Sequence, residues 1–206
     1  MRQTSFFRAA ILSGLAVGMP FVAEAATGFT GDYAPGAALL STGGGGSLDL
    51  SGAPDSITLI GGNNQDFLGS DQLYQFTASV SGVISFEWSY SSEDCCGATW
   101  DPFGYQLNGI FHALVDVTNG VDGLGAPIQG GAFSLAVIAG DTFAFDQNSV
   151  DDATGAATTI VSKFDGPVAG VGGVPEPASW ALMIMGLGAA GAVLRRRHTR
   201  PQIQTI

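Results

Sequence analysis

The chain has 206 residues, which is enough for one folded domain. Its 31 glycines and its low share of charged residues, 12%, exclude a helical bundle and favour short strands joined by tight turns. Of its seven basic residues only Lys163 lies between Ala26 and Val174, where nearly all of the 18 acidic residues are found. Proteins bind phosphate backbones through Lys and Arg, so this acidic middle excludes nucleic acid as a partner. Binding of divalent cations, or a role as a soluble acidic surface, fits the charge better.

Residues 1–25 predict a secretory signal peptide. Arg2 and Arg8 give a positive start, and the apolar stretch 9–22 that follows is too short to span a bilayer comfortably. Ala23 and Ala25 place small side chains at the two positions that a signal peptidase inspects, so we expect this partner to cut after Ala25. A buried N-terminal helix is the alternative interpretation.

Alternation of apolar and polar residues predicts that the middle of the chain is all-β. In residues 84–90 every second side chain is apolar, and residues 74–80 do the same, so each segment would bury one face of a strand. Two-residue turn signals predict hairpins between neighbouring strands. The predicted hairpins are 74–80 with 84–90 through Ser81-Gly82, 103–107 with 110–117 through Asn108-Gly109, and 133–139 with 142–145 through Gly140-Asp141.

The strand count predicts the architecture of the body. Further strands are expected at 47–50, 56–60 and 157–163, and loops at 43–46 and 120–131. Eight or nine short strands over about 120 residues predict an antiparallel β-sandwich of jelly-roll type at residues 26–167. The Gly/Val-rich residues 168–174 would then form a flexible linker. The body also loosely resembles CUB-like sandwiches.

Cys95 and Cys96 are adjacent in a domain that we expect to be exported, where disulfides persist. Adjacent Cα atoms are about 3.8 Å apart, below the usual disulfide range, so a ring between these two thiols would be strained. A vicinal disulfide, a pairing between chains and two free thiols all stay open. Zinc is disfavoured because His112 and His198 are the only histidines.

Acidic residues predict a calcium site at one edge of the sandwich. Ca²⁺ takes six to eight oxygen ligands from carboxylates and loop carbonyls, and calcium is therefore the cofactor that such loops would hold. No spacing here matches an EF-hand, and solvated acidic loops are the alternative interpretation. The candidate ligands are Glu93, Asp94, Asp101, Asp151 and Asp152.

The aromatic residues divide into core and surface positions. Trp88 and Tyr90 share the phase of Phe86 and are expected in the core, whereas Trp100 lies in a polar loop. An exposed tryptophan in this position would be able to stack on a sugar ring. Trp100 is therefore the candidate ligand-stacking residue.

The chain carries no catalytic motif that we recognise. A Gly-x-Ser-x-Gly elbow is missing from the sequence, and His112 has no neighbouring motif partner. Glu87 with Asp101 is imaginable as a glycosidase pair, but the separation of two carboxyl groups is not readable from sequence. We therefore assign no catalytic residues and expect that the protein is not an enzyme.

The C-terminal segment predicts a single transmembrane helix. The apolar run 178–194 is just long enough to cross the hydrocarbon of a bilayer, and a core helix is disfavoured because nothing polar interrupts the run. Trp180 would lie at one interface. Arg195, Arg196 and Arg197 would hold the other end, with residues 198–206, in the cytoplasm, so that the body faces outward from the inner membrane.

The order of these tail features is that of a known sorting signal. Pro175-Glu176-Pro177, then Trp180, then a short apolar helix and three arginines resemble the PEP-CTERM signal in its PEPxxWA form, also labelled an ice-binding protein C-terminal domain. The resemblance covers about residues 174–197, and residues 198–206 beyond the arginines depart from its usual end. It implies a Gram-negative host that makes extracellular polysaccharide, and a membrane-embedded exosortase that processes the tail near Pro175–Pro177.

These features together predict an exported protein. We expect its body first in the periplasm, anchored to the inner membrane, and after sorting at the cell surface or in the extracellular matrix. A structural or adhesive role linked to exopolysaccharide or biofilm is the expected function. A carbohydrate-binding module is the alternative, and a secreted polysaccharide-active enzyme is the third possibility.

Overall fold

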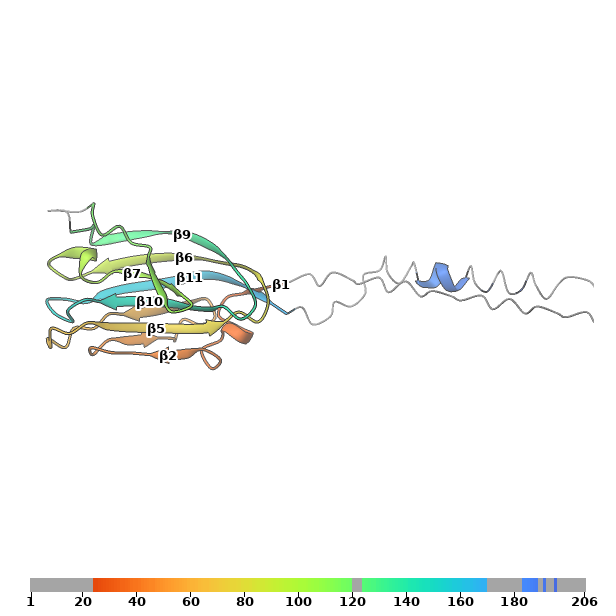
Figure 1. Ribbon diagram of the computed structural model, residues 1–206, viewed down its shortest axis with the longest axis horizontal. Helices are drawn as coiled ribbons and strands as arrows, with labels where there is room; N and C mark the ends of the chain where they lie inside the picture. The colour runs from red at the N-terminus through yellow and green to blue at the C-terminus, as the bar shows by residue number, and fades with distance from the viewer. Residues whose placement is uncertain (1–23, 120–123, 170–182, 189–190, 192–194, 196–206) are drawn as a thin grey trace, which may run out of the picture.

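The body of the protein is a two-layer antiparallel β-sandwich (Figure 1). The computed structural model describes residues 24–119, 124–169, 183–188, 191 and 195. Sheet A has the strand order β3-β4-β11-β6-β9 with β1 added beside β11, and sheet B has the order β2-β5-β10-β7-β8. The predicted all-β sandwich is confirmed, whereas the finer jelly-roll or CUB-like assignment stays a prediction.

Eleven strands and two short 3-10 helices make up the described body. The strands are β1 (Glu24–Thr27), β2 (Leu39–Ser41), β3 (Ser47–Asp49), β4 (Ser56–Ile60), β5 (Ser70–Thr77), β6 (Gly82–Ser92), β7 (Phe103–Leu107), β8 (Ile110–Ala113), β9 (Ile128–Val137), β10 (Thr142–Ser149) and β11 (Ala157–Val168), and the 3-10 helices are η1 (Gly31–Tyr33) and η2 (Gly97–Thr99).

Of the three predicted hairpins, the structure forms one. Strands β7 and β8 pair through the Asn108-Gly109 turn as predicted, with Leu107 opposite Ile110. The other two predictions are wrong, because β5 and β10 lie in sheet B while β6 and β9 lie in sheet A. The turn residues around Ser81 and Gly140 therefore connect the two layers. Turn chemistry predicts that the chain reverses, but it does not distinguish a hairpin from a crossing between sheets.

Strand boundaries also differ from the sequence prediction. The strand expected at 56–60 has the predicted limits, but the strand expected at 157–163 continues to Val168, past the predicted end of the body at residue 167. Residues 128–131 were expected in a loop and instead open β9. β9 pairs with β6 along its whole length, from Ile128 opposite Ser91 to Val137 opposite Gly82, so pairing extends the strand through its glycines.

Strand β11 brings the two ends of the body together. Its first half pairs with β4 and β6, and after a register shift between Ser162 and Asp165 its last residues pair with β1, Glu24 opposite Val168. The chain therefore enters and leaves the sandwich at one end, which we call the tail end (Figure 1). The loops that follow β2, β4, β6 and β10 lie at the opposite end, the loop end.

The predicted signal-peptide cut falls inside β1. Ala23 lies outside the described residues, and Ala25 pairs with Pro167. A cut after Ala25 would leave Ala26 and Thr27 opposite Gly166 and Asp165, so half of this short strand would remain in the mature protein.

Most of the predicted transmembrane segment lies outside the described residues. Residues 183–188 are helical, and within the described part of the chain no helix is long and apolar enough to cross a membrane. Among the sorting-motif residues, only Arg195 belongs to the described part.

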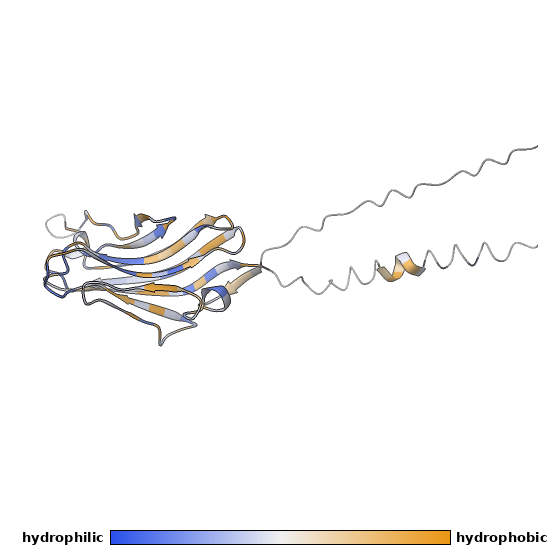
Figure 2. Cartoon of the chain, turned by 60° about the horizontal axis from the view of Figure 1, so that its bottom comes forward, coloured by the Kyte–Doolittle hydropathy of each residue, from blue (hydrophilic) through white to orange (hydrophobic). Residues whose placement is uncertain are grey.

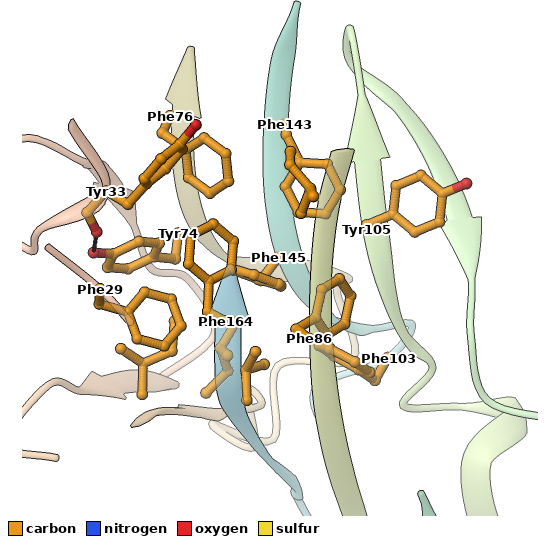
Figure 3. Packing of buried hydrophobic residues seen from close by; sticks show 14 of the residues in the cluster. Phe29, Tyr33, Tyr74, Phe76, Phe86, Phe103, Tyr105, Phe143, Phe145 and Phe164 are labelled. Atoms are coloured by element: carbon orange, nitrogen blue, oxygen red, sulfur yellow. Dashed lines mark hydrogen bonds between the residues drawn. The ribbon is translucent and has the colours of Figure 1, made fainter. Parts of the chain in front are cut away.

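A cluster of aromatic rings fills the space between the sheets (Figure 3). Phe145 on β10 lies at its centre, with ring centroids 4.9 Å from Phe86, 5.2 Å from Phe143 and 5.9 Å from Phe164. These three contacts are edge-to-face, the arrangement that the quadrupoles of aromatic rings favour. Apolar residues recur along the strands that face this core (Figure 2).

We expect Phe145→Ala to destabilise the body strongly. The substitution removes a fully buried ring from the middle of the cluster and leaves a cavity, which costs about 3–5 kcal/mol. Ile160→Ala is the matched control, since Ile160 on β11 is 43% exposed and its loss should cost less than about 1 kcal/mol. Urea unfolding of both variants checks this. Equal losses for the two would contradict the described core.

Candidate functional site

The inner face of sheet B changes from aromatic to polar as it approaches the loop end. Gln147 on β10 pairs with Phe103 on β7 and with Gln72 on β5, and Ser149 pairs with Ser70. The pairing of β10 with β7 continues beyond the strand ends, because Val150 N donates to Trp100 O at 2.7 Å. This register places Asp101 opposite Ser149. Because side chains alternate along a strand, Asp101 shares the inner face with Phe103. A carboxyl group thus lies between the two sheets.

The main chain of Asp101 is held by both sheets. Its carbonyl oxygen accepts hydrogen bonds from the Tyr90 hydroxyl on β6, at 2.9 Å, and from Gln147 Nε2 on β10, at 3.0 Å. The Thr159 hydroxyl on β11 donates to Gln147 Oε1 at 2.7 Å, and Thr159 is itself the pairing partner of Tyr90. Four residues therefore form a buried polar ring that links the layers, which we call the inter-sheet ring.

The Asp101 carboxylate is buried and unpaired. The residue is 1% exposed, and among the described residues neither carboxylate oxygen has a hydrogen-bond partner. Burial is the main reason that the pKa of Asp101 is raised to about 7; the negative charges of Asp94, Asp151 and Asp152 also raise it, and the nearby Ser149 hydroxyl lowers it.

Asp152, in the loop between β10 and β11, is buried at the loop end beside Ser70 and Ser149. Its side chain is 1% exposed, and Oδ1 accepts a hydrogen bond from the Ser70 hydroxyl at 2.6 Å, while its own N–H donates to Ser149 Oγ at 3.0 Å. A Cβ atom on either Gly44 or Gly62 would collide with the Asp152 carboxylate. Glycine at these two positions therefore makes the room in which this carboxylate lies.

Asp94 and the cysteine pair close the loop end from the β6–β7 loop. Asp94 is 6% exposed and accepts hydrogen bonds from Cys96 N and from the Thr154 hydroxyl, each at 2.5 Å. The Sγ atoms of Cys95 and Cys96 are 2.7 Å apart, and hydrogen bonding to Cys95, followed by burial, raises the pKa of the Cys96 thiol to about 11. In the described part of the chain, the ligand atoms of these three residues lie within 4.8 Å of one another.

The five predicted calcium ligands divide by burial. Asp94, Asp101 and Asp152 are buried at the loop end, Asp151 is half-buried, and Glu93 is exposed. The carboxylate of Asp101 is not part of the close group formed by Asp94 and the two cysteines. The structure thus brings the predicted residues to one end of the sandwich without gathering all of them around one point.

Four exposed apolar side chains lie at the same end of the sandwich as the buried acids Asp94, Asp101 and Asp152, which we call the acidic centre. Trp100 is 37% exposed and Val150 is 46% exposed. The two residues are neighbours because Val150 N donates to Trp100 O. Phe67 and Leu68, 70% and 66% exposed, lie in the loop that precedes β5. We call these four residues the loop-end patch. Sequence reasoning identified only Trp100, because exposed apolar residues in a loop do not show which end of the sandwich they reach.

A second buried acid lies on the other side of sheet B. Asp146 on β10 is 1% exposed although its neighbours Phe145 and Gln147 face the core, so it faces outward. Gln106 Nε2 donates to Asp146 Oδ2 at 2.7 Å, whereas Oδ1 has no partner within the described ranges. Burial raises the pKa of Asp146 to about 7, assisted by the charge of Asp71. No motif in the sequence pointed to this residue.

The imagined glycosidase pair is separated by the fold. Glu87 is an exposed residue of β6 whose Oε1 accepts an ion pair from Lys163 Nζ at 2.9 Å. Asp101 instead lies between the sheets at the loop end. His112 on β8 stacks on the ring of Tyr105, with ring centroids 4.9 Å apart. These residues do not converge on a common centre.

Comparison with known families identifies the tail. The family model of the PEP-CTERM protein-sorting motif matches residues 173–197. The chain therefore carries a PEP-CTERM sorting motif, and the resemblance found in the sequence is confirmed. Among curated protein sequences nothing matches the chain.

Two solved structures resemble the body weakly. A family 35 carbohydrate-binding module from Clostridium thermocellum is 13% identical, with a TM-score of 0.31 over 67% of this chain and 97% of the module. A mutant of a family 29 carbohydrate-binding module is 9% identical, with a TM-score of 0.35 over 73% of this chain and all of the module. Likenesses of this degree say nothing about what this chain binds.

We expect Asp146→Asn to change how stability depends on pH. The pKa of a free aspartate is about 3.8, and burial raises that of Asp146 to about 7. Between these values the folded state binds the proton more tightly than the unfolded state, so this residue's contribution to stability falls as pH rises from about 4 to 7. The variant should match the wild type at pH 4 and unfold several degrees higher at pH 8.

Thermal unfolding of both proteins across this pH range measures the effect. Asp165→Asn, at a half-buried position of β11 near the tail end, is the control and should leave the profile unchanged. A gap between Asp146→Asn and wild type that stays constant from pH 4 to 8 would contradict the raised pKa of Asp146.

Proposed function

We propose that this protein is an exported, non-catalytic surface component that an exosortase sorts through its C-terminal tail. The observation that carries the proposal is the PEP-CTERM motif at residues 173–197, which begins shortly after the last strand of the body ends at Val168. A signal peptidase would remove the N-terminal leader. The tail would hold the body at the inner membrane, on its periplasmic side, until the exosortase acts near Pro175–Pro177.

The arrangement of the strands supports this proposal. Because β1 pairs with the last residues of β11, the leader and the sorting tail both leave the sandwich at the tail end. The loop end then projects away from the membrane while the tail is still inserted. In this orientation, the exposed loop-end patch is the part that meets the surroundings of the cell first.

The proposed role outside the cell is structural or adhesive, in a matrix of exopolysaccharide or in a biofilm. Carbohydrate binding is the second candidate, and the specific observation in its favour is the exposed Trp100 beside Val150 at the loop end. Aromatic rings that are exposed in this way stack on the apolar faces of sugars. A polysaccharide-active enzyme is the third candidate, and the separation of Glu87 from Asp101 disfavours it.

Cys95 and Cys96 would be oxidised after export. The contact between their Sγ atoms within one chain favours an intramolecular pair over a pairing between chains. Non-reducing electrophoresis with intact-mass measurement separates these states from a free dithiol.

Replacing Pro175, Glu176 and Pro177 by alanine should block sorting. In cells that express tagged protein, we expect the wild type at the surface or in the medium, and the triple variant retained in the inner-membrane fraction with its tail uncut. Pro201→Ala, beyond the arginines, is the control and should behave as the wild type. Identical fractionation of the triple variant and the wild type would contradict processing at this motif.

Trp100→Ala should weaken binding to host exopolysaccharide if the second candidate is right. Loss of one stacking aromatic costs about 1–3 kcal/mol, which corresponds to an about 5- to 150-fold loss of affinity. Phe111→Ala on β8 is a matched control, because Phe111 is 36% exposed, almost as much as Trp100, and lies near the tail end. Pull-down on purified polysaccharide measures how much of each variant is retained. Equal retention of the two would contradict a stacking role for Trp100.

A further inference from the structure

Strand β9 is an edge strand without the usual protections of an edge. The strand orders end on β3 and β9 in sheet A and on β2 and β8 in sheet B, and β9 has ten residues whereas the other three have three or four. Natural proteins protect an edge by shortness, charges, prolines or bulges, because an open edge pairs with other chains. β9 contains no charged residue and no proline, and its pairing with β6 has no register shift.

The free edge of β9 is open over most of its length. Among the described strands only β6 pairs with it, and β9 lies outermost in its layer (Figure 1). Asp116 of the preceding loop binds the side chain of Gln129, but within the described residues no backbone hydrogen bond from outside the sheet reaches residues 130–137. Phe133 and Leu135 belong to the inner face of sheet A and are still only half-buried. An additional strand at this edge would cover both side chains.

The charge distribution favours a second copy of this chain as the partner. Nearly all acidic residues lie in the body, and its single lysine is bound to Glu87, so two copies repel each other over most of their surfaces. Residues 103–113, which form β7, β8 and the turn between them, contain no Asp, Glu, Lys or Arg, and neither does β9. The rings of Tyr105 on β7 and Phe133 on β9 have centroids 4.9 Å apart, so these strands form one side of the sandwich. At this uncharged side two acidic bodies can approach, whereas a basic partner would be drawn to the acidic surfaces instead.

We propose that two copies of this chain associate by pairing their β9 strands antiparallel, across a two-fold axis near Phe133 and Ser134. All strand pairings described in this protein are antiparallel, and an edge strand that meets its own copy across a two-fold axis continues this pattern. Sheet A of one copy would continue into sheet A of the other. Pairing of the open residues 130–137 would add about eight hydrogen bonds between the chains, within the range of a typical protein interface.

This pairing would give the protein a way to build a matrix, a consequence that rests on the structural role proposed above. β9 runs along the long axis of the body, so antiparallel pairing places the tail ends of the two copies at opposite ends of the dimer (Figure 1). Two copies that are both still inserted in one membrane would have their tail ends side by side at that membrane. The pairing therefore joins a copy to one that has been released or that belongs to another cell, so assembly would follow processing of the tail.

The test is sedimentation velocity of the full-length protein in mild detergent, over about 1 to 100 μM, where dimers of micromolar affinity dissociate. We expect the wild type to dimerise. Ser134 is exposed on the outer face of β9, so a charge there would face its copy near the two-fold axis. Ser134→Glu and Ser134→Lys should each weaken the dimer at least about threefold, because like charges across paired strands are destabilising. An equimolar mixture of the two variants should associate at least about threefold more tightly than either alone, since Glu then faces Lys.

Ser89→Glu is the matched control. Ser89 is also exposed on the outer face of sheet A, but it lies on β6, one strand inside the edge, so this variant should associate as the wild type does. Urea unfolding of each variant checks that the body folds. Cross-linking gives a second measurement, in a background of Cys95→Ser and Cys96→Ser. With oxidised glutathione, Ser134→Cys should form a disulfide-linked dimer and Ser89→Cys should not.

Three results would overturn the proposal. A wild type that stays monomeric at about 100 μM would leave the edge of β9 to a foreign strand or to polysaccharide. Equal association of Ser134→Glu and the wild type would place the contact elsewhere. A mixture of the Glu and Lys variants that associates no more tightly than either alone would exclude pairing at β9. None of these measurements involves the exosortase, so they leave the proposed sorting untouched.

Discussion

The alignment of the two sheets at the loop end depends on one main-chain carbonyl that both sheets bind. Asp101 O accepts the Tyr90 hydroxyl from sheet A and the Gln147 amide from sheet B, and Thr159 completes the inter-sheet ring. Aromatic contacts fill the space between the layers, and at the tail end the Tyr74 hydroxyl of sheet B donates to Tyr33 O while the Tyr33 hydroxyl donates to Pro167 O of sheet A. Directional hydrogen bonds between buried groups fix how the sheets align at the loop end, and leaving one of these groups unpaired would cost about 1–3 kcal/mol.

This ring explains why the two ends of the sandwich differ chemically. At the tail end, apolar rings such as Phe76 and Phe143 occupy the inner face, and the chain enters and leaves beside them. At the loop end the same face carries Ser70, Ser149 and Asp101, with Asp152 behind them. The body is thus polarised along its long axis: the sorting tail is attached to one end, and the acidic centre and Trp100 lie at the other.

Sequence patterns predicted the local elements better than their assembly. The alternation around Phe86 and the Asn108-Gly109 turn identified strands and one hairpin correctly, because both signals are local. The hairpins at Ser81 and Gly140 were wrong, because whether a chain turns back or crosses to the other layer depends on partners distant in sequence. The tail motif was recognisable because its residues are read as a linear signal, without folding.

The candidate site was predictable only in part for the same reason. Counting acids drew attention to Asp94, Asp101 and Asp152, but the same count included Glu93, which is exposed. Burial of Asp101 follows from its register opposite Ser149, and the space for Asp152 follows from two glycines in other loops. Asp146 escaped notice because a single acid within a strand usually faces solvent, whereas here the outward position is covered.

A double-mutant cycle on the inter-sheet ring tests this account most directly. Tyr90→Phe and Thr159→Val each remove one hydroxyl from the ring, and each should cost about 1–2 kcal/mol in the free energy of unfolding. If the ring acts as a unit, the coupling energy between these two substitutions should be at least about 0.5 kcal/mol. The control cycle combines Tyr90→Phe with Tyr74→Phe, because the Tyr74 hydroxyl donates to Tyr33 O outside the inter-sheet ring (Figure 3). The two effects in this control cycle should be additive. Additivity in both cycles would contradict a single polar clamp between the sheets.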